Sequence, residues 1–217
     1  MTTPFRFYSQ AHLVKVLGQK AHNIGELLEG IRTVPGSSIY YHTHRFLQQH
    51  HYLSPEPPND FAYWVGNILN QAKLSEAIAS VDTISFMKIE SLRQAFIEVI
   101  TAHASSRHDT AMCTEGQEFY FRSCQTFVFP TNHEAGNLHE FLDQIQKVTV
   151  HSLYFHMFEA PLRLKKEGSD FVAWFKGIGE EDLAQKLARL DPYTMTLEGL
   201  RKRIAELVRH HVAKKHQ

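Results

Sequence analysis

A histidine is followed by an aspartate at two matching places in this chain, 18 residues later in one copy and 14 residues later in the other. Each pair lies in the pattern Ser-x-Tyr-x-His and then Asp-Phe-x-x-Trp. The first pair is His42 and Asp60, followed by Trp64, and the second is His156 and Asp170, followed by Trp174. A histidine held by a carboxylate has a fixed tautomer, so it can act as a general base or as a metal ligand. The pattern therefore predicts two sites for proton transfer, metal ligation or ligand binding.

The aromatic residues of both motifs extend the candidate site. If each copy forms half of a pseudo-symmetric pocket, we expect the ligand to be bound by Tyr40, Tyr41, His42, Asp60, Trp64, Tyr154, His156, Asp170 and Trp174. The alternative is structural, because a feature kept in both copies is what a shared fold would need. In that interpretation the tyrosines and tryptophans pack in the core. The two histidines are then buried and hydrogen-bonded to Asp60 and Asp170.

The first copy also carries a histidine cluster that the second lacks. His51 lies seven residues after His44, so a helix would present both on one face. Together with Glu56 or Asp60 they could hold one divalent transition metal, the cofactor that the sequence suggests. Neither His-Glu-x-x-His nor Glu-x-x-His occurs, which argues against a zincin or a ferritin-type di-iron centre. A solvated helix face followed by the proline-rich segment 54–58 is the structural alternative.

The spacing of the motifs indicates an internal duplication. Phe5–Ser9 returns as Phe119–Ser123, and Ser38–His42 returns as Ser152–His156, both at an offset of 114 residues. A fixed period of this kind decides the architecture before any other feature.

We therefore expect a first repeat at residues 1–103, a linker at 104–118 and a second repeat at 119–217. The two repeats are expected to form one body, intertwined about a pseudo-twofold axis through their strands. The predicted fold class is α+β and predominantly helical, with a small central β-sheet and about four helices per repeat.

Each repeat is expected to begin with a short strand, and Pro130 is expected to end the second one. Apolar stripes predict helices over 24–31 and 138–145, and a second pair of amphipathic helices over 89–100 and 197–208. Residues of the types that cap helix N-termini precede the other helices, and the predicted caps are Ser38, Ser152, Asn59 and Ser169.

Composition limits the class of protein. Lys plus Arg and Asp plus Glu number 23 each, so the formal net charge is zero and a nucleic-acid surface over the whole protein is not expected. The two cysteines form no CxxC pair, and no run of 18 apolar residues occurs. We therefore expect a cytoplasmic protein without a transmembrane segment. A basic C-terminal helix, which includes Arg201 and Lys215, is a candidate for contact with an acidic partner.

Four segments resemble a prokaryotic family known as a domain of unknown function, whose members look duplicated in the same manner. They span residues 35–44 and 54–64 in the first half and 152–156 and 190–194 in the second. The resemblance covers nearly the whole chain. It implies a shared fold, but it brings no activity, cofactor or catalytic residue.

Three functions remain open at this point. The first is a cytoplasmic ligand-binding or regulatory module, with its pocket at the interface of the two repeats and an unknown small molecule or protein as partner. The second is a metal-dependent or histidine acid–base enzyme that uses the first-repeat histidines. The third is a scaffold whose aromatic motifs only hold the fold. The sequence does not decide whether the protein is an enzyme.

Overall fold

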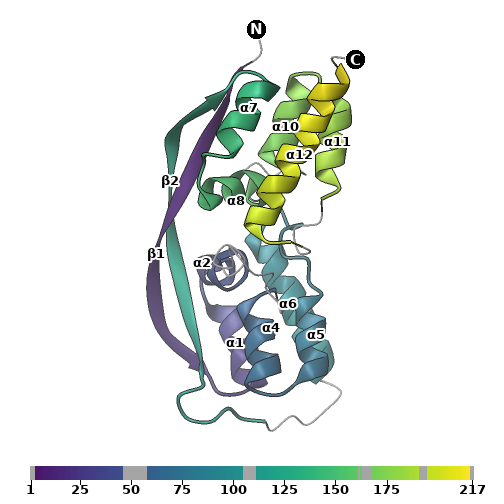
Figure 1. Cartoon of the computed structure of the whole chain (residues 1–217). Helices are drawn as coiled ribbons and strands as arrows, with labels where there is room; N and C mark the ends of the chain where they lie inside the picture. Colours follow the sequence, from purple (N-terminus) through teal and green to yellow (C-terminus); the bar gives the residue numbers. More distant parts are fainter. Residues whose placement is uncertain are drawn as a thin grey trace. The chain divides into compact units, whose positions relative to one another are not determined.

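A computed structural model describes residues 3–45, 58–104, 111–160, 162, 168–190 and 195–215. These residues form an α+β fold in which helices predominate and the sheet consists of two antiparallel strands (Figure 1). The predicted class is therefore confirmed. The strands are β1 (Phe5–Ala21) and β2 (Phe119–Ala135).

The described residues divide into two compact units. Unit 1 contains residues 3–11 and the described part of 126–217, whereas unit 2 contains 12–45, 58–104 and 111–125. Each strand contributes one segment to each unit. Consequently, the helices from one half of the sequence share a unit with the strand segment that begins the other half.

Unit 2 is built on the helices from the first half of the chain. They are α1 (Ile24–Thr33), α2 (Gly36–Tyr40), the π-helical turn η1 (Tyr41–Arg45), α4 (Asp60–Asn67), α5 (Ala72–Ala79) and α6 (Ile89–Ala104). Their apolar sides enclose one core, into which β2 inserts Phe119 and Phe121. The ring of Phe61 lies 5.3 Å from that of Phe96 and 5.4 Å from that of Phe119, measured between centroids. The first segment of β2 is thus part of this core.

Unit 1 repeats this arrangement with the helices from the second half. They are α7 (Leu138–Ile145), α8 (Val150–Phe158), α10 (Asp170–Gly177), α11 (Glu181–Ala188) and α12 (Leu197–Lys215). Here β1 supplies the inserted aromatic rings, Phe5 and Phe7, and the Phe5 ring lies 5.2 Å from that of Phe171. The hydroxyl of Thr131 in β2 donates to the carbonyl of Phe7 at 2.7 Å and so links the two strands within this unit.

The capping residues were predicted only in part. Asn59 and Ser169 cap α4 and α10 through their side chains, as expected. Ser38 and Ser152 are not caps, because α2 begins after Pro35 and α8 after Thr149, which places both serines inside the helices. Their hydroxyls are buried and make no hydrogen bond within the described residues.

The strands are longer than the sequence predicted. Each spans 17 residues, and β2 continues through Pro130, which was wrongly expected to end it. A strand of a two-stranded sheet has one unpaired edge, and proline is tolerated where its nitrogen faces such an edge. Continuation of β1 past Ser9, through a segment that alternates less clearly, was not foreseen.

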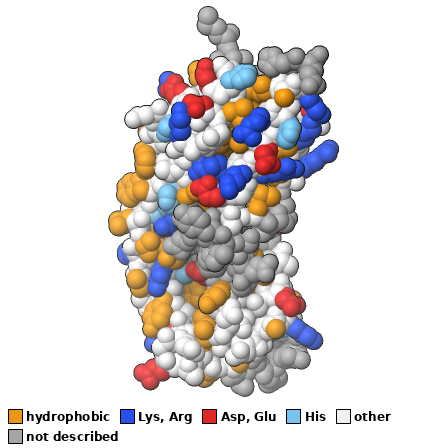
Figure 2. Space-filling model, viewed as in Figure 1, with side chains coloured by type: hydrophobic (Ala, Val, Ile, Leu, Met, Phe, Trp, Pro, Cys, Tyr) orange, Lys and Arg blue, Asp and Glu red, His pale blue; other side chains and the backbone are white. Residues whose placement is uncertain are grey.

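The middle segment of each strand leaves apolar side chains exposed (Figure 2). In β1 they are Leu13, Val14 and Val16, and in β2 they are Phe127, Val128 and Phe129. The first residues of each strand alternate between buried and exposed positions, and the last residue of each, Ala21 or Ala135, is buried again. The buried segments are therefore those that carry the repeated Phe-x-Phe pattern.

Close packing between α1 and β2 gives a stability prediction. A Cβ at Gly30 would lie 2.1 Å from Cζ of Phe121. We expect Gly30→Ala to lower the free energy of unfolding by about 1–3 kcal/mol, because the buried ring must shift. Urea denaturation measures this. As a control, Gly177→Ala places its Cβ in open space, and it should be neutral or stabilise by up to about 1 kcal/mol. If Gly30→Ala and Gly177→Ala lowered the free energy of unfolding equally, close packing against Phe121 would not explain the loss.

Candidate functional site

His42 connects a helix and a strand in unit 2. It lies in η1 and is buried. Its Nδ1 is 2.6 Å from Oδ2 of Asp60, at the start of α4, and its Nε2 is 3.0 Å from the backbone nitrogen of Arg122 in β2. The amide of Arg122 must donate to Nε2, so Nδ1 carries the ring proton and donates to the carboxylate. The predicted histidine–aspartate contact is therefore confirmed.

His156 makes the same connections in unit 1. Its Nδ1 is 2.6 Å from Oδ2 of Asp170, at the start of α10, and its Nε2 accepts from the backbone nitrogen of Tyr8 in β1 at 2.8 Å. The histidine ring also lies against the first phenylalanine of the strand in both units. The centroids are 4.8 Å apart for Phe5 and His156, and 4.7 Å apart for Phe119 and His42.

These contacts restrict what the two histidines can do. The nitrogen that would accept a proton or bind a metal already accepts a backbone N–H, so either role requires loss of that hydrogen bond. Burial lowers the pKa of His42 against the opposing effect of Asp60, and nearby Arg122 lowers it further. The imidazole of His42 is therefore neutral near neutral pH and serves as a connector between helix and strand.

A pocket lies beside the His42–Asp60 pair in unit 2. Its volume is about 290 Å³, and it is lined by His42, Asp60, Tyr63, Trp64, Glu118, Phe119, Tyr120 and Arg122. The side chain of Asp60 is 28% exposed, whereas that of His42 is 3% exposed. The carboxylate, and not the imidazole, is therefore the polar group of the pair that a ligand could reach.

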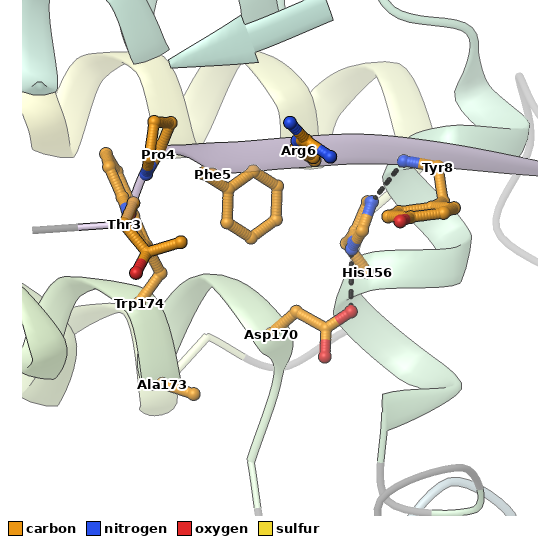
Figure 3. A pocket seen from close by; sticks show the side chains of 9 residues that line it. All are labelled: Thr3, Pro4, Phe5, Arg6, Tyr8, His156, Asp170, Ala173 and Trp174. Atoms are coloured by element: carbon orange, nitrogen blue, oxygen red, sulfur yellow. Dashed lines mark hydrogen bonds and ion pairs between the residues drawn. The ribbon is translucent and has the colours of Figure 1, made fainter. Parts of the chain in front are cut away.

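A second pocket lies beside the His156–Asp170 pair in unit 1 (Figure 3). Its volume is about 340 Å³, and it is lined by Thr3, Pro4, Phe5, Arg6, Tyr8, His156, Asp170, Ala173 and Trp174. Figure 3 shows the chain of hydrogen bonds from Tyr8 through His156 to Asp170 along one side of the pocket. The side chain of Asp170 is 13% exposed.

The two tryptophans form matching walls of these pockets. The indole N–H of Trp64 donates to the carbonyl of Gln117 at 2.7 Å, and that of Trp174 donates to the carbonyl of Thr3 at 3.2 Å. Each indole is thereby fixed to the chain just before a strand. Its polar atom is occupied, so it offers a ligand mainly its ring surface.

The structure thus brings together six of the nine predicted ligand-binding residues. Three line the pocket of unit 2 and three that of unit 1: His42, Asp60 and Trp64, then His156, Asp170 and Trp174. The tyrosines Tyr40, Tyr41 and Tyr154 line neither pocket. Tyr40 stacks on the ring of His44, and the side chain of Tyr154 is fully buried against Phe158.

The proposed metal ligands are only partly within the described residues. His51 and Glu56 lie outside them. His44 is fully buried, its Nδ1 is 3.0 Å from the hydroxyl of Thr43, and burial lowers its pKa to about 4. Asp60 is hydrogen-bonded to His42. Among the described residues, no three His, Cys, Asp or Glu side chains gather in a way that could hold a metal ion.

Several residues of the pockets were not predicted. Those from the strands, among them Arg6, Tyr8, Tyr120 and Arg122, belong to the repeated Phe-x-Phe segments, for which the sequence predicts only short strands. The signal was present in the sequence, because these segments recur at the same offset as the histidine motifs.

The sequence repeats one further feature, at the start of the last helix of each half. Glu-x-Leu-Arg opens both terminal helices, and its arginines, Arg93 and Arg201, are buried. The guanidinium of Arg93 donates to the carbonyl of Ile31, and that of Arg201 donates to the carbonyl of Ile145. Each arginine thereby satisfies a carbonyl near the end of the first helix of its unit. Arg201 therefore has a structural role and is not free for a partner.

Part of the remaining basic charge of α12 is also used within unit 1. Glu180 accepts from Lys215 at 2.7 Å and from His211 at 2.8 Å. Other Lys and Arg side chains over α12 remain at the surface (Figure 2). Among the described residues, no helix combines the length and apolar character needed to cross a membrane.

The chain belongs to a protein family without an assigned function. A family model described as "Family of unknown function (DUF5752)" matches residues 2–209. The predicted membership of an uncharacterised family is therefore confirmed. The solved structure of OrfY from Thermoproteus tenax is similar to this chain, with 28% sequence identity and a TM-score of 0.79. The similarity covers 96% of this chain and 95% of that chain. No functionally curated protein matches the sequence.

If the two histidines hold the strands in place, their removal should destabilise the protein. We expect His42→Ala and His156→Ala each to lower the free energy of unfolding by about 2–4 kcal/mol, because a buried amide and a carboxylate lose their partner. Chemical denaturation measures the loss. The exposed His210 is the matched control, and His210→Ala should change stability by less than about 0.5 kcal/mol. If His42→Ala or His156→Ala were as stable as the wild type, the substituted histidine would not be what holds the strand in place.

Burial of His44 predicts a dependence of stability on pH. The unfolded chain binds a proton at this residue as the pH falls below the ordinary histidine pKa of 6.5, but the native state does not until about pH 4. Stability should therefore fall on acidification, and His44 should account for a loss of about 2 kcal/mol at pH 5. Phenylalanine stands at the matching position 158, so His44→Phe should remove this contribution.

Urea denaturation at pH 7.5 and pH 5 tests the assignment. The difference in the free energy of unfolding should be smaller in His44→Phe than in wild type by about 2 kcal/mol, and it should be unchanged in His210→Ala. An unchanged difference in His44→Phe would mean that His44 does not carry the pH dependence.

Proposed function

We propose that this protein is a ligand-binding module with one small-molecule pocket in each unit. The observation that carries the proposal is the repeated combination of an accessible carboxylate with an aromatic wall beside a buried histidine. Binding sites of proteins commonly combine apolar walls with a few fixed polar groups, and the two volumes lie near the lower end of their usual range. A regulatory role would follow if ligand binding altered the contacts of the strands.

Binding is favoured over acid–base catalysis by the state of the histidines. The imidazoles of His42 and His156 use both ring nitrogens within the protein. A general base needs a free lone pair directed at the substrate. The carboxylate of Asp60 is 28% exposed and can accept a hydrogen bond from a ligand, and that of Asp170 lines the other pocket. The geometry therefore supports recognition more than proton transfer.

We also propose that the two halves arose by internal duplication. Support comes from the matched connections of the two histidines, from the two fixed indoles and from the two buried arginines. In each unit the pocket lies between strand residues from one half of the sequence and helix residues from the other. Neither Cys113 nor Cys124 forms a disulfide, which fits our proposal that the protein works in the reducing cytoplasm.

The two tryptophans make the proposal testable, because the chain contains one in each pocket and no others. Protein labelled with 5-fluorotryptophan should give two ¹⁹F resonances, which Trp64→Phe assigns. We expect compounds in a library of small polar metabolites to shift one or both resonances in a saturable manner. Ligand binding should also raise the midpoint of thermal unfolding.

A variant that fills a pocket provides the control. Ala173 lines the pocket of unit 1, and Tyr63 occupies the corresponding place in unit 2. We expect Ala173→Phe, which adds bulk without adding a third fluorotryptophan, to abolish ligand-induced shifts of the Trp174 resonance and to leave those of Trp64 unchanged. If no compound shifts either resonance, the protein is not a small-molecule module of this kind.

A further inference from the structure

Opposite charges line the pocket of unit 2 without pairing with each other. Asp60 and Arg122 both line it, yet no ion pair joins them. Asp60 lies at the start of α4 and Arg122 lies in β2, so different elements hold the two charges. Both are connected to His42, which fixes the carboxylate of Asp60 and the backbone of Arg122.

The carboxylate of Asp60 is only partly engaged within the protein. It accepts one hydrogen bond, from the ring N–H of His42. One oxygen of the carboxylate is engaged at 2.6 Å, and the side chain is more than a quarter exposed. The second oxygen is thus available to a donor in the pocket.

Arg122 supplies an exposed cation at this pocket. Within the described part of the chain, no carboxylate forms an ion pair with it. Its charge lies close enough to His42 to contribute to the lowered pKa of that imidazole. A guanidinium presents several donors in one plane and suits a carboxylate or a similar anionic group.

The other charges around this pocket are already compensated. Glu118 lines the pocket, but it pairs with Lys20 at 3.1 Å. The pocket of unit 2 therefore offers one uncompensated anion and one uncompensated cation.

The pocket of unit 1 lacks this combination. Tyr8 takes the place of Arg122, because the amide of each donates to the histidine of its unit. Arg6, at the position of Tyr120, forms an ion pair with Glu134 at 2.9 Å. Arginine and tyrosine are thus exchanged between the two strand motifs, and the cation of unit 1 is already paired.

We propose that the pocket of unit 2 binds a small zwitterion of the amino-acid class. The ammonium group of the ligand pairs with Asp60 and its carboxylate pairs with Arg122. The aromatic side chains of Tyr63, Trp64 and Tyr120 contact the carbon atoms between the two charges. Charge-assisted hydrogen bonds at both ends of the ligand make its binding specific. The inference rests on the proposed function, since it names the ligand class for one of the two pockets.

Titration of the fluorotryptophan-labelled protein tests this inference. The probes are glycine, β-alanine and γ-aminobutyrate, which separate the two charges by one, two and three carbon atoms. We expect at least one of them to shift the Trp64 resonance in a saturable manner and to leave the Trp174 resonance in place. N-acetylglycine and glycine methyl ester each carry one of the charges and should bind at least tenfold more weakly.

Variants then identify the charged groups. Arg122→Gln should weaken binding of the best probe at least tenfold, and Asp60→Asn should do the same. Arg32→Gln is the control, because Arg32 is an exposed arginine of unit 2 outside the pocket. It should bind as wild type does. Circular dichroism and thermal unfolding of Arg122→Gln establish that this exposed substitution leaves the fold intact, so the result does not depend on Asp60→Asn.

Three outcomes would overturn the inference: no saturable shift of Trp64 with any of the three probes, equal affinity for the single-charge analogues, or equal loss in Arg122→Gln and Arg32→Gln. If metabolites of another class shift the Trp64 resonance while the zwitterions do not, the binding module stands and the ligand class is wrong. If no compound shifts either resonance, both proposals fail.

Discussion

The fold depends on a buried imidazole that joins a strand amide to a helix carboxylate. In unit 2, His42 accepts the N–H of Arg122 and donates to Asp60, and in unit 1, His156 does the same between Tyr8 and Asp170. Leaving a buried amide unpaired costs free energy. The strand residue whose amide donates to the histidine therefore has a fixed position. Because the phenylalanines lie beside it in the strand, their positions in the core are fixed as well. The pocket, its aromatic wall and its accessible carboxylate all follow from that placement.

The same connection limits the chemistry of the site. A histidine near an aspartate in a sequence suggests a general base, but here the lone pair of the ring is already used. The ring nitrogen that could have taken up a proton instead holds a strand amide in place. The carboxylate of the aspartate remains as the group that faces the pocket. The two units then diverge through the residues on the strands. Exchange of arginine and tyrosine between the strand motifs, and the pairing of Arg6 with Glu134, give the two pockets different charge.

Local sequence predicted the features that depend on local contacts. The apolar stripes of α1 and α7 and the caps at Asn59 and Ser169 involve neighbours within one or two helical turns, and the structure contains them. Prediction was wrong where packing overrides local preference. Ser38 and Ser152 are good capping residues that lie inside helices, because Pro35 and Thr149 begin those helices earlier. Pro130 remains within β2, since a two-stranded sheet leaves an edge at which no donor is needed.

The amino-acid sequence by itself determined that the strand and histidine motifs recur at an offset of 114 residues. It also predicted a mostly helical chain in which each histidine has an aspartate for a partner. It did not determine which strand segment meets which helices. Only the tertiary structure decided that the strand at the start of one half lies in the unit formed by helices of the other half. The physical reason is that hydrophobic periodicity reports which face of an element is buried, but it carries no information about the partner that buries it. The pockets consist of side chains from those distant partners, so their composition appeared only with the fold.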